Sequence, residues 1–175
     1  ASRTAIMRDG RFVQTGTPEE IVMEPADDYV LEFTREVDRS RVLTFRTIME
    51  EAETVPEGMP AGKIRAMLQS RPDASTVFVT CSAGKPQGVI RRPAVNAAGE
   101  EQSAGQIMTS NFLKIRASKY IHNAFEAIRN ANTIAVTDKT GRLVGTVDPI
   151  AVFSHLRSPL KPEAEKTNGQ ARELS

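Results

Sequence analysis

Two adjacent arginines, Arg91 and Arg92, are placed where ligand chemistry is possible. They follow the apolar stretch Gly88-Val89-Ile90, which is typical of a strand end, and they stand where a helix is expected to begin. Two guanidinium groups there could hold a phosphodiester, as in a cyclic dinucleotide, because guanidinium pairs with phosphate through two parallel hydrogen bonds. The alternative is a pair of solvated arginines in a loop, since arginine is common at protein surfaces.

A second concentration of charge is the run from Leu113 to His122, which carries Lys114, Arg116 and Lys119. No acidic residue between Met108 and Glu126 neutralises them. Attraction between exposed charges weakens with salt, because the Debye length falls from about 10 Å at 0.1 M to about 3 Å at 1 M. The run is either a salt-sensitive basic patch or the ordinary solvated start of a helix.

Other reactive side chains favour structural interpretations. Cys81 ends an apolar strand and is expected to be a small core residue rather than a nucleophile. His122 and His155 lack the spacing of metal ligands, which argues against a metal site. Three acidic residues are typical of a solvated face rather than of catalytic carboxylates: Glu50, Glu51 and Glu53.

Composition excludes several classes of protein. The net charge is +1 over 175 residues, whereas a dedicated nucleic-acid binder carries a strong basic excess. A single cysteine excludes an intrachain disulfide and fits a reducing compartment. No apolar run approaches the roughly 20 residues that span a bilayer. We therefore expect an intracellular globular protein that does not bind nucleic acid.

The first 36 residues predict a hairpin followed by two helices. Asp9-Gly10 is a strong hairpin-turn signal, because glycine accepts positive φ without steric cost. Thr17, Pro18 and Glu20 form a capping-box start for one helix, which Pro25 should interrupt. A second helix is expected from Asp27 or Asp28 to about Glu36.

Beyond Val37 the chain contains an internal repeat, in which Gly88 matches Gly145 and Ala94 matches Ala151 at a common offset. Helices are predicted around 61–69 and 118–130, and strands at 76–81, ending at 90, at 133–137 and at 143–147. Each repeat is thus helix, strand, strand, helix, too small to close a core alone but able to pack sheet against sheet with its twin. The expected fold is a pseudo-symmetric α/β module.

This repeat resembles a tandem pair of cystathionine-beta-synthase (CBS) motifs. The stretches RTAIMRDGRFVQTGTPEEI and PADDYVLEFTREVDRSRVLTFRTIM resemble the C-terminal end of the ATP-binding subunit of glycine betaine/proline (osmoprotectant) ABC importers. The resemblance implies the end of an ATP-binding domain at 1–38, CBS repeats at 39–98 and 99–157, and a polar tail at 158–175 expected to be disordered. No G-x-x-x-x-G-K-[ST] occurs, so we expect this chain not to hydrolyse ATP, although the parent subunit would be a transport ATPase.

CBS pairs place adenine nucleotides in clefts between the repeats, using a Ser or Thr for phosphate and an Asp three residues later for ribose. Here Arg91 and Asp148 occupy the phosphate positions, and alanines replace both aspartates. AMP and ATP are therefore disfavoured, and the carboxylate of Asp148 would repel an anion. The implied cleft residues are Arg91, Arg92, Thr133, Thr146 and Asp148, with an adenine nucleotide or cyclic di-AMP as the ligand, if one binds.

The resemblance implies a regulatory sensor that controls an osmoprotectant importer in response to ionic strength. Lys114, Arg116 and Lys119 would contact an anionic lipid surface and release at high salt. The implied partners are a second copy of the chain, the ABC ATPase domain and the membrane permease subunit, at the cytoplasmic face of the membrane. Two alternatives remain: a nucleotide or cyclic-dinucleotide receptor, and a purely structural dimerisation module.

Overall fold

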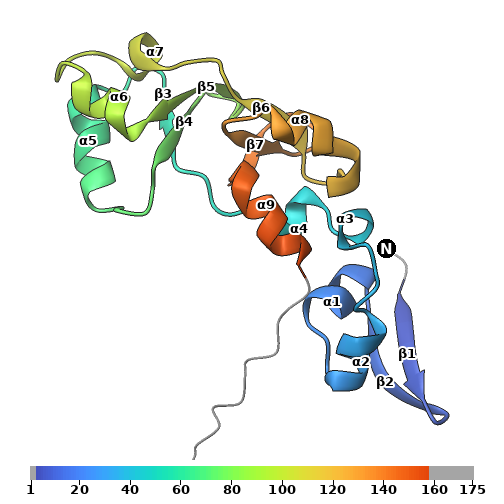
Figure 1. Ribbon diagram of the computed structural model, residues 1–175. Helices are drawn as coiled ribbons and strands as arrows, with labels where there is room; N and C mark the ends of the chain where they lie inside the picture. Colours follow the sequence, from blue (N-terminus) through green and yellow to red (C-terminus); the bar gives the residue numbers. More distant parts are fainter. Residues whose placement is uncertain (1–2, 158–175) are drawn as a thin grey trace, which may run out of the picture.

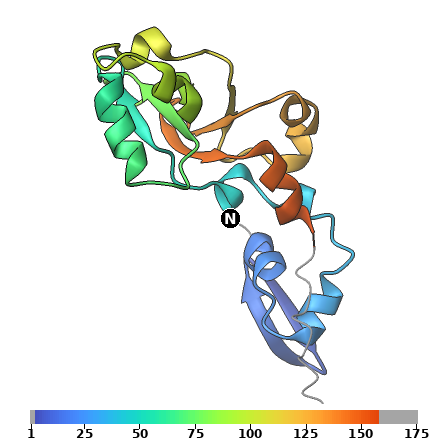
Figure 2. The ribbon, with the colours of Figure 1, turned by 60° about the vertical axis from the view of Figure 1, so that its left-hand side comes forward.

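A computed structural model describes residues 3–157, so the tail predicted at 158–175 lies outside the described residues. A small N-terminal unit is joined to a larger unit built from two three-stranded sheets (Figure 1). Figure 2 shows the N-terminal unit extending away from the two sheets, to which it is connected through short helices. No helix among the described residues is long and apolar enough to cross a membrane.

The N-terminal unit confirms the predicted hairpin and capping box. Its elements are β1 (Thr4–Arg8), β2 (Arg11–Gly16), α1 (Pro18–Met23) and α2 (Asp28–Phe33). Asp9 and Gly10 both take positive φ in the turn, as the Asp-Gly signal predicts. The Thr17 side chain accepts the Glu20 N–H, and the Glu20 carboxylate accepts the Thr17 N–H. A small core of Ile6, Ile21 and Val30 holds the unit together.

The first sheet has the order β3-β4-β5, with β3 parallel and β5 antiparallel to β4. The elements of this half are α3 (Arg39–Val42), α4 (Phe45–Ile48), β3 (Thr54–Pro56), α5 (Ala61–Gln69), β4 (Thr76–Thr80), β5 (Pro86–Arg91) and α6 (Arg92–Ala97). The predicted helix at 61–69 and the two strands are confirmed.

The second sheet repeats this pattern as β6-β7-β8. The elements of this half are α7 (Ala104–Ile107), β6 (Leu113–Arg116), η1 (Ile121–Ala124), α8 (Phe125–Arg129), β7 (Ile134–Thr137), β8 (Leu143–Val147) and α9 (Pro149–Leu156). The predicted internal repeat is therefore confirmed as two sheet-and-helix units.

The expectation that each repeat opens with a helix was incomplete, because β3 and β6 each add a strand before it. The interpretation of the basic run as a helix start was wrong for its first four residues, which form β6. In β6 the side chain of Ile115 is buried between the exposed cations Lys114 and Arg116. This alternation has the two-residue period of a strand with one buried face.

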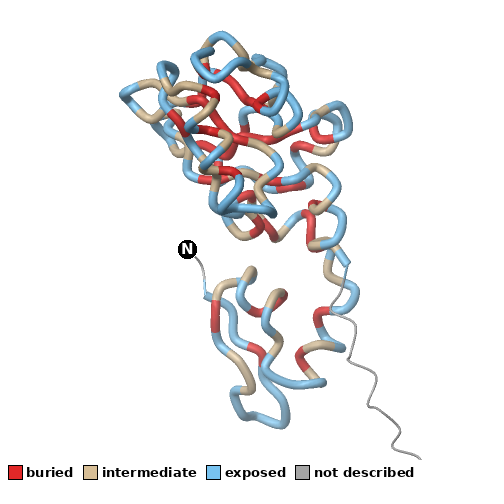
Figure 3. Tube along the Cα trace, turned by 90° about the vertical axis from the view of Figure 1, so that its left-hand side faces the viewer, coloured by how far each residue is buried: buried red, intermediate tan, exposed pale blue. Residues whose placement is uncertain are grey.

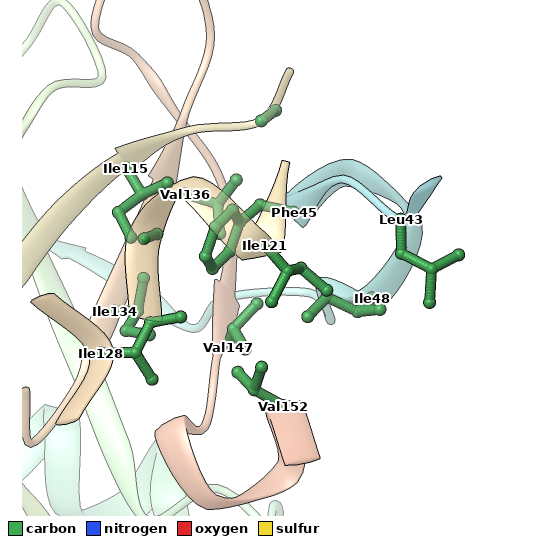
Figure 4. Packing of buried hydrophobic residues seen from close by; sticks show 12 residues of the cluster. Leu43, Phe45, Ile48, Ile115, Ile121, Ile128, Ile134, Val136, Val147 and Val152 are labelled. Atoms are coloured by element: carbon green, nitrogen blue, oxygen red, sulfur yellow. The ribbon is translucent and has the colours of Figure 1, made fainter. Parts of the chain in front are cut away.

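The leading helical turn of each half packs into the core of the other half. Leu43, Phe45 and Ile48 lie in one hydrophobic cluster with β6, β7, β8 and α9 (Figure 4). Reciprocally, Ala104 and Ile107 pack with α5, β4 and β5. The buried residues are concentrated in these interlocked halves, with a smaller group in the N-terminal unit (Figure 3).

The two sheets also meet each other directly. Phe78, Val89 and Ala135 form a buried cluster that includes residues of both sheets. The hairpin turns touch, since the Leu143 N–H donates to the Gly84 carbonyl at 2.9 Å. The expected sheet-against-sheet packing is therefore present.

Candidate functional site

The larger cleft between the repeats has a volume of about 510 Å³. Thr133, Thr146 and Asp148, which the sequence suggested as ligand-binding residues, all line it. The opposite wall is the loop from Ser70 to Thr76 that follows α5. Glu50, Glu51 and Glu53, which follow α4, also line the cleft. The volume lies within the range of about 300–1,000 Å³ typical of small-molecule sites.

This cleft is strongly acidic. Its charged lining consists of five carboxylates and one guanidinium: Glu50, Glu51, Glu53, Asp73, Asp148 and Arg71. The guanidinium is already paired, because Arg71 Nη1 lies 2.5 Å from Glu53 Oε1. Phosphate groups would therefore enter a negative potential, which disfavours ordinary nucleotide binding.

Two of the cleft residues serve the backbone. Thr146 Oγ1 donates to the carbonyl of Ile134 at 3.0 Å, which ties β8 to β7. Asp148 caps α9, and its Oδ1 accepts the Ile150 N–H at 2.7 Å. Thr133, immediately before β7, is only 7% exposed. These contacts explain the residue types without a ligand, and the predicted binding role stays a prediction.

The adjacent arginines have separate environments. Arg92 donates to the carbonyls of a single segment, 3.1 Å from Leu68, 2.7 Å from Arg71, 3.2 Å from Pro72 and 2.6 Å from Ala74. Arg92 thus ties the chain after α5 to the start of α6. Arg91 is exposed and lines a smaller cleft of about 280 Å³ with Thr109, Asn111 and Asn132. The pair does not act on one ligand in this arrangement.

The basic patch is defined here as Lys114, Arg116 and Lys119. All three side chains are exposed, and none forms an ion pair within residues 3–157. Lys114 Nζ lies 5.3 Å from the centroid of the Phe112 ring, a cation–π contact. The charges therefore remain available to an external anionic surface.

The structure brings a fourth cation next to the patch. The Arg46 N–H donates to the Ala117 carbonyl at 2.8 Å, and the Phe45 N–H donates to the Lys119 carbonyl at 3.1 Å. Arg46 is exposed and comes from the leading turn of the other half, so linear spacing could not assign it. The acidic cleft was missed for the same reason, because its carboxylates come from distant segments. In the sequence, Glu50, Glu51 and Glu53 are typical of one solvated face.

Cys81 is half-buried in the turn after β4, so the expectation of a core cysteine was wrong. Backbone N–H groups of Lys85 and Ala83 directed at its sulfur lower the pKa of the thiol. Between residues 3 and 157 no group of three or more His, Cys, Asp and Glu side chains is arranged to hold a metal ion.

Comparison with known proteins identifies the fold family. The CBS domain family matches residues 104–158. The chain has the fold of a tandem CBS module. A CBS domain-containing protein from Bacillus anthracis has the same fold, with a TM-score of 0.58 at 16% identity over 68% of this chain and 96% of that chain. Staphylococcus aureus OpuCA gives a TM-score of 0.54 at 16% identity, over 61% and 93% of the two chains.

Curated relatives extend the match beyond the CBS module. The glycine betaine transport ATP-binding protein OpuAA of Bacillus subtilis is 34% identical over 176 residues, which is 99% of this chain and 42% of that protein. The glycine betaine/carnitine transport ATP-binding protein GbuA of Listeria monocytogenes is 35% identical over 55% of this chain and 24% of that protein. The chain thus spans less than half of the length of these relatives.

Proposed function

We propose that this chain is the regulatory part of an ATP-binding subunit of an osmoprotectant ABC importer. The observation that carries this proposal is the match to OpuAA over 99% of the chain, which includes the N-terminal unit as well as the CBS module. In this proposal residues 1–38 end the ATP-binding domain, 39–98 and 99–157 form the CBS repeats, and the parent subunit hydrolyses ATP. The parent works at the cytoplasmic face of the membrane with its permease, and the CBS modules pair as a homodimer.

Ionic strength is the proposed signal, and the basic patch is its receptor. Each basic residue close to an anionic leaflet contributes about 1 kcal/mol, so three give a marginal contact that salt can release. The absence of ion pairs to these three side chains within residues 3–157 supports this role, because internal carboxylates would otherwise screen them. The acidity of the larger cleft supports salt over nucleotide as the signal.

A short structural path leads from the patch to the N-terminal unit. The backbone after β6 is hydrogen-bonded to α4 through Ala117 and Lys119. The helix before α4 is α3, which contacts α1 of the N-terminal unit. A membrane contact that favours one arrangement of this joint would bias ATPase dimer closure by its differential affinity for the two states.

The test uses vesicles with anionic or purely zwitterionic lipid and the full chain. Wild-type chain should sediment with anionic vesicles at 0.1 M salt and release toward 1 M. The variant Lys114→Gln/Arg116→Gln/Lys119→Gln should lose this binding. A control that removes three exposed cations elsewhere, Arg11→Gln/Lys63→Gln/Lys139→Gln, should keep it. Equal binding by the two triple variants would refute the patch as the receptor.

A second candidate function rests on Arg91 in the smaller cleft, where Asn111 and Asn132 add uncharged hydrogen-bonding groups. Its volume of about 280 Å³ suits one small anionic moiety rather than a cyclic dinucleotide. Calorimetric titration with AMP, ATP and cyclic di-AMP tests it. Saturable micromolar binding that Arg91→Gln abolishes would establish a nucleotide receptor, and heats that Arg91→Gln leaves unchanged would exclude this cleft.

A further inference from the structure

The joint between the N-terminal unit and the CBS module contains a buried arginine. Arg39 begins α3, which contacts α1 on one side and η1 of the second repeat on the other. Figure 1 shows α3 between these two parts of the molecule. Only 8% of Arg39 is exposed, and burial lowers the pKa of its guanidinium.

One edge of this guanidinium lacks an oxygen acceptor. Nε is enclosed and has no hydrogen-bond partner, and Nη2 lies 3.2 Å from the thioether sulfur of Met23. The neighbouring carboxylate of Asp38 is already occupied, because it accepts from the Ser40 N–H, the Ser40 hydroxyl and Arg41 Nε. Within residues 3–157 no carboxylate pairs with Arg39.

The chemistry of that edge is specific. Nε and Nη2 direct parallel N–H bonds from the same side of the guanidinium, the geometry that binds a planar or tetrahedral oxyanion through two hydrogen bonds. A thioether is a weak acceptor, and a buried cation without a counter-charge is costly. Methionine is flexible and can move aside at low cost.

We propose that the Nε–Nη2 edge of Arg39 is a binding site for a small free oxyanion such as phosphate, which displaces the Met23 side chain. Because Met23 ends α1, occupation of the site alters the contact between the N-terminal unit and α3. The inference is independent of the basic patch, since it concerns a buried side chain in a different part of the molecule and a free anion rather than a membrane.

The experiment is thermal unfolding followed by circular dichroism, with phosphate replacing chloride at constant ionic strength. Wild-type chain should gain about 3–6 °C at a phosphate concentration about ten times the dissociation constant. Arg39→Met should lose the phosphate-specific gain while its midpoint in chloride does not fall. Arg41→Met, which removes an exposed arginine paired with Asp38, should keep the gain. No gain in the wild type, or an equal gain in Arg39→Met, would overturn the proposal.

A second measurement does not require a folded variant. In the wild-type chain, the NMR resonance of the Arg39 Nε–H, assigned by through-bond correlation to the Arg39 backbone, should shift saturably with phosphate. The resonance of the exposed Arg41 should move less. A stationary Arg39 signal across the titration would contradict oxyanion binding at this edge.

Discussion

Replacing Arg92 by methionine should destabilise the module far more than the same change at Arg91. Arg92 donates to four carbonyls through Nη1 and Nη2 at 2.6–3.2 Å, whereas Arg91 is exposed at the mouth of the smaller cleft. Hydrogen bonds to a charged group contribute about 1.5–3 kcal/mol each, but three of these four share Nη2. Because Arg92 is only partly buried, we expect a loss of about 2–3 kcal/mol for Arg92→Met and under about 0.5 kcal/mol for Arg91→Met.

Urea unfolding monitored by circular dichroism measures both variants. With a slope of about 2 kcal/mol per M, the unfolding midpoint of Arg92→Met should fall by about 1–1.5 M at unchanged slope. Arg91→Met should unfold within about 0.3 M of wild type. Equal midpoints for the two variants would refute the assignment of Arg92 to the loop after α5. A lower midpoint for Arg91→Met than for Arg92→Met would reverse the roles.

Three further predictions address the sheets and a turn. Gly145→Ala should lower the free energy of unfolding in urea by about 2–3 kcal/mol, because an added Cβ would lie 2.7 Å from the Glu50 carbonyl oxygen. As a control, Gly99→Ala should change it by under about 0.5 kcal/mol, because the nearest atom to an added Cβ there lies 3.6 Å away. Ile115→Ala should cost about 2–4 kcal/mol and the adjacent Lys114→Ala under about 0.5 kcal/mol, and similar losses would contradict the strand β6. The Thr140 hydroxyl, with the backbone N–H groups of Arg142 and Thr140, holds the pKa of Asp138 below its ordinary value of 3.8. The Asp138 carboxylate therefore contributes to folding stability above that pH, and this contribution is lost as the pH falls through the lowered pKa. The stability difference between wild type and Asp138→Ala should therefore shrink below about pH 3.8, and a difference that grows there would be incompatible with this assignment.

Local signals in the sequence predicted the N-terminal unit well. Thr17 and Glu20 satisfy each other's backbone N–H groups, and Asp9-Gly10 sets the hairpin turn, so these elements depend on residues only a few positions apart. The repeat was also visible in the sequence, because close packing favours glycine at both Gly88 and Gly145. A Cβ at either position would meet a methionine of the other half, Met108 or Met49 respectively.

The candidate sites were less predictable because their members come from distant segments. The acidic cleft joins residues 50–53 to the loop after α5 and to the ends of β7 and β8. Nothing local to Glu50 or Asp73 indicates that they face the same space. Arg91 and Arg92 posed the opposite problem, because Arg91 ends β5 and Arg92 begins α6, so two adjacent side chains reach different environments. The period-two alternation around Ile115 was present in the sequence, but the concentration of positive charge dominated its interpretation.

The exchange of leading turns determines how a signal can spread through this module. Leu43 and Phe45 are fully buried in the core of the second repeat, and Ala104 is fully buried in the core of the first. Neither core is complete without a segment of the other half, so the two repeats are expected to unfold and rearrange together rather than independently. The segment exchanged into the second repeat is also the one that leads back through α3 to α1. A force or ligand acting on β6 therefore has a path to the N-terminal unit through the second core, α4 and α3. The first repeat can alter that path through its contacts with the second sheet, which include the cluster of Phe78, Val89 and Ala135 and the hydrogen bond from the Leu143 N–H to the Gly84 carbonyl.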